Sequence, residues 1–192
     1  MHFSEEIITR NKWLFNMTII IGLCIIGSIT CIAQNRIVID KLKFELIVQS
    51  NKGDTLLVMP CAVGLNAGQK EREGDMKTPE GIFSIASIEN SSKWTHDFKD
   101  GYGKRKGAYG PWFIRLKTPK FKGIGIHGTC FPESIGKQSS EGCVRLRNED
   151  LLKLVPYVKK GDIVIIHKGW VKPINIILPQ KLDVNECSAL IY

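Results

Sequence analysis

Two short stretches decide how this chain is interpreted: Ile126–Thr129, which reads Ile-His-Gly-Thr, and Ser140–Arg145, which reads Ser-Glu-Gly-Cys-Val-Arg. They place His127 sixteen positions before Cys143, with a glycine beside each. A cysteine thiol is mostly protonated near neutral pH, because its unperturbed pKa is about 8.5. A neighbouring imidazole can accept that proton and so activate the sulfur. The pattern therefore predicts a nucleophilic Cys143 with His127 as its general base.

The residues around this pair predict the remaining parts of an acyl-transfer site. Such a site needs hydrogen-bond donors for the developing oxyanion, and we expect the backbone N–H groups of Gly142 and Cys143 to supply them. Ser140 is expected to hydrogen-bond within the loop. Arg145 can hold a substrate carboxylate, since a guanidinium binds carboxylates in bidentate fashion. No Asp or Asn stands out as a partner for His127, so a backbone carbonyl is expected to orient it.

These stretches resemble the L,D-transpeptidase catalytic domain (the YkuD-type family) of bacterial cell-wall enzymes. Further matches to the family's signature are Ser134–Gly136 and the upstream Gly74-Asp75 with Lys77–Phe83, which reads Lys-Thr-Pro-Glu-Gly-Ile-Phe. Two separated motifs in the right order are far more specific than either alone. The resemblance covers about residues 36–168. It implies a mainly β fold, an L,D-transpeptidase-type β-sandwich with one short helix and long surface loops.

The resemblance also implies a reaction and its partner. The thiolate of Cys143 would attack a peptidoglycan stem tetrapeptide at its third residue and release the terminal D-alanine. An amine from another stem would then resolve the thioester into a crosslink. No cofactor, metal ion or nucleic acid is implied, and a monomer is expected. The candidate substrate-binding residues are Arg145, Gly128, Thr129, Trp112 and Tyr109.

Glu141 departs from the family pattern, in which the loop reads Ser-His-Gly-Cys. A carboxylate two residues from the thiol should raise its pKa if the side chains face each other. Glu141 therefore leaves a non-catalytic wall-binding protein open as an alternative. Two others stay open on separate grounds: hydrolysis by an L,D-carboxypeptidase, and a structural zinc module built from His127, Cys130 and Cys143.

The amino-terminal residues 1–33 predict export. Arg10 and Lys12 precede an apolar stretch that runs from about residue 13 to residue 33. This pattern is typical of a signal peptide or of an uncleaved membrane anchor. It places the protein in the periplasm or cell envelope, with membrane contact through this segment only. Residues 34–168 are then the catalytic domain and residues 169–192 a C-terminal tail.

The net charge narrows the class of binding partner, and the cysteine count argues against a disulfide-stabilised fold. The 27 Lys and Arg against 19 Asp and Glu give a formal net charge of +8, which favours anionic partners such as cell-wall polymers. No run of Lys and Arg is interleaved with aromatic residues, which argues against nucleic-acid binding. The cysteines after residue 33 are too few for a disulfide scaffold: Cys61, Cys130, Cys143 and Cys187.

Hydrophobic periodicity predicts strands, two long loops and one helix. The loops are residues 66–80 and 89–107, and a long loop in a compact domain often covers a site. The helix is expected to be capped by Asn148, to bury Leu151 and Leu154, and to be shortened by Pro156. The predicted strands are residues 42–48, 55–59, 81–85, 109–116, 124–127 and 162–167.

Overall fold

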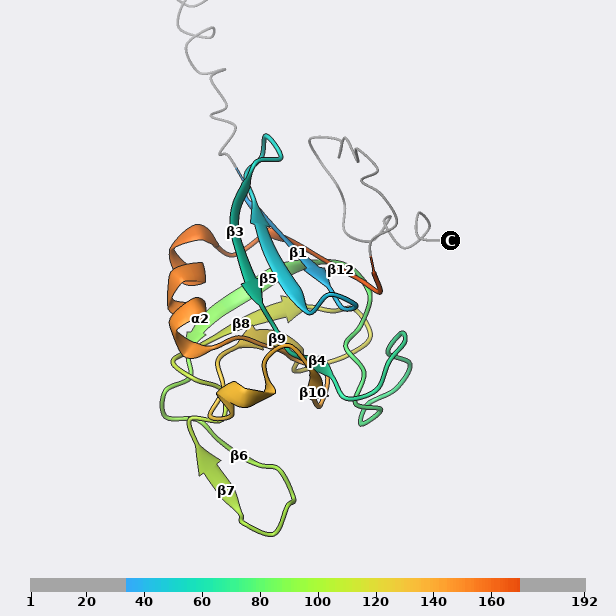
Figure 1. The fold of residues 1–192 in the computed structure, drawn as a ribbon, viewed down its shortest axis with the longest axis vertical. Coiled ribbons are helices and arrows are strands. Elements are labelled where there is room, and N and C mark those ends of the chain that lie inside the picture. Colours follow the sequence, from blue (N-terminus) through green and yellow to red (C-terminus); the bar gives the residue numbers. More distant parts are fainter. Residues whose placement is uncertain (1–33, 170–192) are drawn as a thin grey trace, which may run out of the picture. The chain divides into compact units, whose positions relative to one another are not determined.

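The computed structural model describes residues 34–169, and they form a mainly β unit as expected (Figure 1). The α-helix of this region is α2 (Asn148–Leu154), with 3-10 turns η1 (Pro132–Ser134) and η2 (Val155–Tyr157). The strands are β1 (Arg36–Asp40), β2 (Glu45–Gln49), β3 (Thr55–Pro60), β4 (Val63–Gly64), β5 (Gly81–Asn90), β6 (Thr95–Asp97), β7 (Lys104–Lys106), β8 (Trp112–Lys117), β9 (Gly125–His127), β10 (Gln138–Ser140), β11 (Val144–Arg145) and β12 (Ile163–His167).

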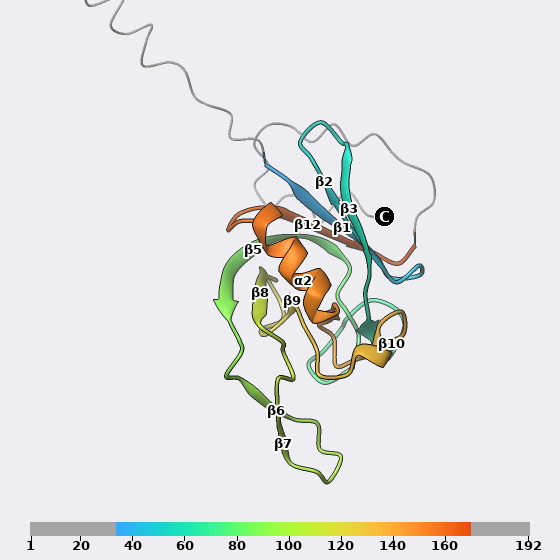
Figure 2. The same cartoon turned by 60° about the vertical axis from the view of Figure 1, so that its left-hand side comes forward.

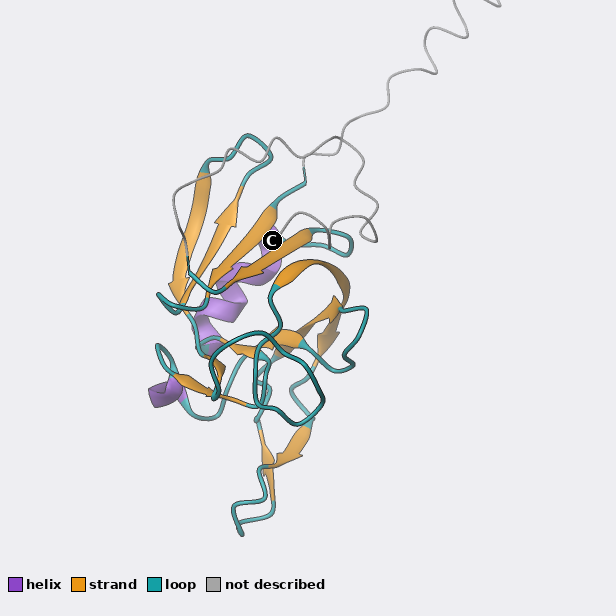
Figure 3. Cartoon of the chain, turned by 90° about the vertical axis from the view of Figure 1, so that its right-hand side faces the viewer, coloured by secondary structure: helices purple, strands orange, loops and turns teal. Residues whose placement is uncertain are grey.

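Eight strands form one sheet in the order β11-β9-β8-β5-β12-β1-β2-β3. Most neighbours are antiparallel, but β1 pairs with β12 in parallel and β9 pairs with β11 in parallel. The pairing of β5 with β8 shifts register between Ile85 and Ser87, and such a bulge bends a strand. The sheet curls, and Figure 3 shows the strong curvature of its strands.

The core fills the inside of this curled sheet and includes one face of the helix. Ile37 and Leu46 come from one end of the sheet, and Ile114 and Ile126 come from the other; all four are fully buried. Leu151 of α2 joins the same cluster. Figure 2 shows α2 alongside the strands of the sheet. Burying an aliphatic side chain of this kind contributes about 1.5–3 kcal/mol. The His127 and Cys143 motifs are therefore attached to a well-packed frame.

Two local predictions need correction. Leu42 was expected in a strand, but it lies in the turn between β1 and β2 and is 72% exposed. Asn148 does not cap the helix: it is the first helical residue, and its Oδ1 accepts a hydrogen bond from the Thr129 N–H at 3.0 Å. Pro156 does shorten the helix, since α2 ends at Leu154 and a 3-10 turn follows.

The long loop expected over residues 89–107 contains a small hairpin. Strands β6 and β7 pair in antiparallel fashion as a separate two-stranded sheet, which projects from the main sheet in Figures 1 and 2. Strand β10 likewise pairs with β4 outside the main sheet. Strand β10 ends at Ser140, the first residue of the second motif.

The predicted signal peptide or anchor at residues 1–33, and the predicted tail apart from Gly169, lie outside the described residues, as does Cys187. No helix within residues 34–169 is long and apolar enough to cross a membrane.

Candidate active site

The parallel pairing of β9 with β11 brings the two motifs together. Arg145 is the register partner of His127, and the Leu146 N–H donates to the His127 carbonyl at 2.9 Å. On its other side, Arg145 exchanges backbone hydrogen bonds of 2.8 and 2.9 Å with Ala62. Cys143 directly precedes β11, so this short strand fixes where the thiol stands relative to His127.

Both members of the predicted catalytic pair line one cavity of about 330 Å³. Tyr109, Glu141 and Arg145 line it as well. A cavity with a thiol, an imidazole and a guanidinium in its wall combines a nucleophile, a proton acceptor and an anion-binding group.

His127 is a buried, neutral base. Its Nδ1 lies 2.6 Å from the Gly128 carbonyl oxygen. A carbonyl can only accept, so Nδ1 carries the proton and Nε2 keeps its lone pair. Burial lowers the pKa of His127 to about 3, although the Gly128 carbonyl opposes this shift. The imidazole is therefore uncharged at neutral pH and able to accept a proton.

Aromatic rings fix the plane of this imidazole. Phe113 is the cross-strand partner of His127 on β8, and the two rings stack with centroids 5.4 Å apart at 12°. Tyr109 packs against the same imidazole with centroids 5.0 Å apart. Such contacts restrict rotation of the ring. The backbone carbonyl that was expected to orient the imidazole is that of Gly128.

The Cys143 thiol is held in its protonated form. It donates a hydrogen bond to the Gly123 carbonyl at 3.3 Å. Burial raises the pKa of the Cys143 thiol; the Gly125 backbone and the charges of Arg145 and Arg115 lower it, while the Glu141 carboxylate raises it further. The resting pair is accordingly a thiol and a neutral imidazole in the wall of one cavity, and not a thiolate and an imidazolium.

Arg145 carries a buried positive charge. It is 7% exposed, and its Nη1 donates to the Ser139 carbonyl at 3.2 Å. Its Nε has no hydrogen-bond partner within the described part of the chain. Burial lowers the pKa of Arg145, and nearby acidic groups oppose that shift. A buried guanidinium with a spare donor beside a cavity is suited to a carboxylate.

The loop before Cys143 differs from expectation in one respect. The Gly142 N–H donates to Ser140 Oγ at 3.1 Å, so this donor is used within the loop and does not face an oxyanion. Ser140 Oγ also donates to the Cys143 carbonyl, which agrees with its predicted role inside the loop. The Cys143 N–H remains the candidate oxyanion donor.

Gly142 must be a glycine for a geometric reason. Its φ is +131°, and a Cβ there would lie 2.9 Å from the Lys77 carbonyl oxygen. The catalytic loop thus rests directly on the upstream Lys77–Phe83 motif, which explains why the two motifs occur together. Thr78 within that motif is fully buried and accepts a hydrogen bond from the Gly64 N–H at 2.7 Å.

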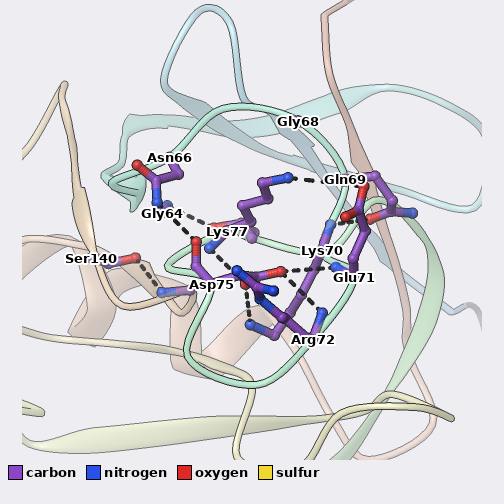
Figure 4. Close-up of polar contacts among 12 residues, drawn as sticks. Gly64, Asn66, Gly68, Gln69, Lys70, Glu71, Arg72, Asp75, Lys77 and Ser140 are labelled. Atoms are coloured by element: carbon purple, nitrogen blue, oxygen red, sulfur yellow. Dashed lines mark hydrogen bonds and ion pairs between the residues drawn. The ribbon is translucent and has the colours of Figure 1, made fainter.

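Asp75 organises the loop that leads into this motif (Figure 4). Its carboxylate accepts a hydrogen bond from Lys70 Nζ at 2.6 Å and from the backbone N–H groups of Glu71, Arg72 and Lys77. Burial opposes ionisation, but these donors hold the pKa of Asp75 well below its usual range. Lys70 also lines the cavity, so the loop forms part of the wall.

The L,D-transpeptidase catalytic domain (YkuD) family matches residues 34–166, which include both motifs and every residue of the cavity. The chain belongs to this family.

Individual proteins of known name or structure are also similar to this chain. A stretch of 62 residues is 39% identical to the candidate L,D-transpeptidase YkuD of Bacillus subtilis strain 168; it covers 32% of this chain and only 36% of that relative. The L,D-transpeptidase from Mycobacterium smegmatis superimposes with a TM-score of 0.55 at 22% identity, over 70% of this chain and 59% of the other. The helical cell shape determining protein Pgp2 from Campylobacter jejuni gives 0.59 at 23% identity, over 72% and 49%. At such identities these two structures show a shared fold.

Of the remaining predicted site residues, some line the cavity and others lie outside it. Tyr109 lines the cavity, whereas Trp112 is packed against the core and does not. Gly128 supplies the carbonyl for His127, and a Cβ at this position would lie 2.1 Å from Asn148 Oδ1. Thr129 is buried, and its hydroxyl accepts from the Phe131 N–H. Gly128 and Thr129 therefore hold backbone groups of the site in place, and a substrate contact by Trp112 stays a prediction.

The zinc alternative is not supported. Among the described residues, no three His, Cys, Asp or Glu side chains lie close enough together to hold a metal ion, so His127, Cys130 and Cys143 do not form such a group. Cys61, Cys130 and Cys143 are free thiols.

Sequence reasoning missed two residues of the site. Phe113 lies in the predicted strand 109–116 and His96 in the predicted loop 89–107, and neither was assigned to the site. His96 lines the cavity and lies 3.2 Å from the Glu141 carboxylate. The available signal was the cluster of aromatic residues within residues 94–113, which is unusual for a polar surface loop.

Proposed function

We propose that this member of the L,D-transpeptidase family is a cysteine acyltransferase that acts on peptidoglycan stem peptides in the cell envelope. The observation that carries the proposal is a protonated thiol and a neutral imidazole in the wall of one cavity, with a buried guanidinium beside them. The family membership supports the choice of substrate.

The first half of the reaction forms a thioester. Cys143 Sγ attacks the carbonyl carbon of the third stem residue while its proton moves to Nε2 of His127. Because burial disfavours both the thiolate and the imidazolium, we expect the proton transfer to accompany the attack. His127 then returns the proton to the amine of the leaving D-alanine as the C–N bond breaks.

The second half releases the acyl group. An amine of another stem peptide attacks the thioester, its proton passes through His127 to the Cys143 sulfur, and a crosslink results. Water in place of the amine gives a shortened tripeptide. Arg145 is proposed to bind a carboxylate of the donor peptide, and the Cys143 N–H to donate to the oxyanion.

The test is incubation of the purified protein with disaccharide-tetrapeptide, followed by mass spectrometry. A crosslinked dimer that lacks one D-alanine indicates transpeptidation, and a free tripeptide indicates hydrolysis. Cys143→Ala is expected to abolish both products, whereas Cys130→Ala, which removes a neighbouring free thiol, should retain them. Full turnover by Cys143→Ala would refute the mechanism.

A further inference from the structure

His96 connects three segments around the cavity. It lies on β6, its Nε2 is 3.2 Å from both Glu141 carboxylate oxygens, and its Nδ1 is 3.0 Å from the Tyr109 hydroxyl. A carboxylate only accepts, so Nε2 carries a proton and donates to Glu141. In the neutral imidazole, Nδ1 then accepts from the phenol. Burial raises the pKa of Tyr109, which keeps this phenol protonated as a donor.

The two ends of this hydrogen-bonded chain reach the catalytic pair. Glu141 stands two residues before Cys143, and its charge raises the pKa of the thiol. Tyr109 packs against the imidazole of His127. His96 itself also packs against Phe98 of the same hairpin, with ring centroids 4.6 Å apart. His96 thus ties the β6–β7 hairpin to the catalytic loop, and Phe98 adds a second contact, since the Arg145 guanidinium lies 5.6 Å from the centroid of its ring.

Glu141 is the acidic group whose charge opposes ionisation of Cys143, while Arg145 and Arg115 favour it. Tyr109 and His127 also line the cavity, but both are uncharged at neutral pH. The other charged groups in its wall are Lys70, Glu73 and Lys122. A donor held against Glu141 draws its carboxylate toward the hairpin and partly compensates its charge. Loss of that donor leaves the carboxylate free to act on the thiol.

We propose that His96 is a positioning residue, which holds the Glu141 carboxylate on the β6–β7 hairpin side of the cavity and fixes Tyr109 against His127. The inference rests on the proposed role of Cys143 as the nucleophile. It adds an imidazole from a distant hairpin to the site, and it gives the unusual Glu141 a specific partner.

The test measures how fast iodoacetamide alkylates Cys143 as a function of pH, with the modified peptide quantified by mass spectrometry. The rate follows the thiolate fraction and so reports the thiol pKa without any substrate. His96→Phe keeps an aromatic ring beside Phe98 but loses both hydrogen bonds. We expect its profile to shift to higher pH by about half a unit, which is about a threefold lower rate at neutral pH.

Two further variants separate this role from a general loss of structure. His96→Gln can still donate to Glu141, and its profile should stay close to that of the wild type. In Glu141→Gln the profile should move to lower pH, and adding His96→Phe to it should produce no further shift. A His96→Phe profile that matches the wild type, or a shift that persists without the Glu141 charge, overturns the inference.

This outcome is distinguishable from failure of the proposed function. Turnover by Cys143→Ala would remove the catalytic role of the thiol, yet the alkylation profiles of the His96 variants would still report the contact with Glu141.

Discussion

Mild acid is expected to destabilise this fold through His127. The imidazole is 3% exposed, and its pKa falls from the usual 6.5 to about 3 on folding. The unfolded chain therefore binds a proton at a pH where the folded protein does not. Stability from this residue is fully present above pH 6.5 and is lost progressively as the pH falls toward 3.

The magnitude follows from the width of that window. Each pH unit below the unfolded pKa costs about 1.4 kcal/mol, so lowering the pH from 7.5 to 5 should remove about 2 kcal/mol of unfolding free energy. That is a large fraction of the roughly 5–15 kcal/mol typical of a domain. Asp75 and Glu89 also have lowered pKa values, but their effects begin mainly below about pH 4.5.

Urea unfolding followed by tryptophan fluorescence, at several pH values between 7.5 and 5, measures this loss. His127→Gln is the control, because an amide keeps a donor for the Gly128 carbonyl but does not titrate. Its unfolding free energy should change by much less over the same range. Equal pH dependence in the wild type and the variant would refute the assignment of a buried neutral imidazole.

Three further substitutions test the frame of the site. Gly142→Ala should destabilise the protein by about 1–3 kcal/mol and lower turnover at least tenfold, because its Cβ would meet the Lys77 carbonyl oxygen. The control is Gly136→Ala, which is also at positive φ but has no atom within 4 Å of the added Cβ, and it should retain turnover. Asp75→Asn should cost about 2–3 kcal/mol in thermal or urea unfolding, since it removes the charge that orders the loop; an unchanged unfolding midpoint would contradict this. Arg145→Lys should raise KM more than it lowers kcat if the guanidinium binds a carboxylate, and equal binding of the donor peptide would exclude that role.

The sequence was most informative where spacing alone determines chemistry. The interval between His127 and Cys143, together with the glycines beside them, predicted a shared site, and the alternation of apolar residues predicted a mainly β fold. The expectation that Ser140 bonds within its loop also agrees with the structure. Each of these predictions depends on residues close together in the chain.

The rest depends on contacts between distant segments, which one sequence cannot supply. Glu141 and His96 are separated by 45 positions, so nothing local indicates that they meet. The strand assignment for Leu42 failed because the β1–β2 turn is set by Asp40, whose side chain accepts hydrogen bonds from the Leu42 and Lys43 N–H groups. Nor does the sequence decide where Trp112 packs, because an aromatic residue beside a motif can face either the cavity or the core; the structure packs it against the core.

The parallel pair of β9 and β11 lies at the margin of the eight-stranded sheet, and β11 is only two residues long. Margins of sheets fray at lower free energy than central strands. Strand β11 is nevertheless held on both sides, by β9 and by the Arg145–Ala62 backbone hydrogen bonds, and Val144 and Leu146 are fully buried. Because Cys143 directly precedes this two-residue strand, the two sets of backbone hydrogen bonds on either side of β11 determine where the thiol lies relative to His127.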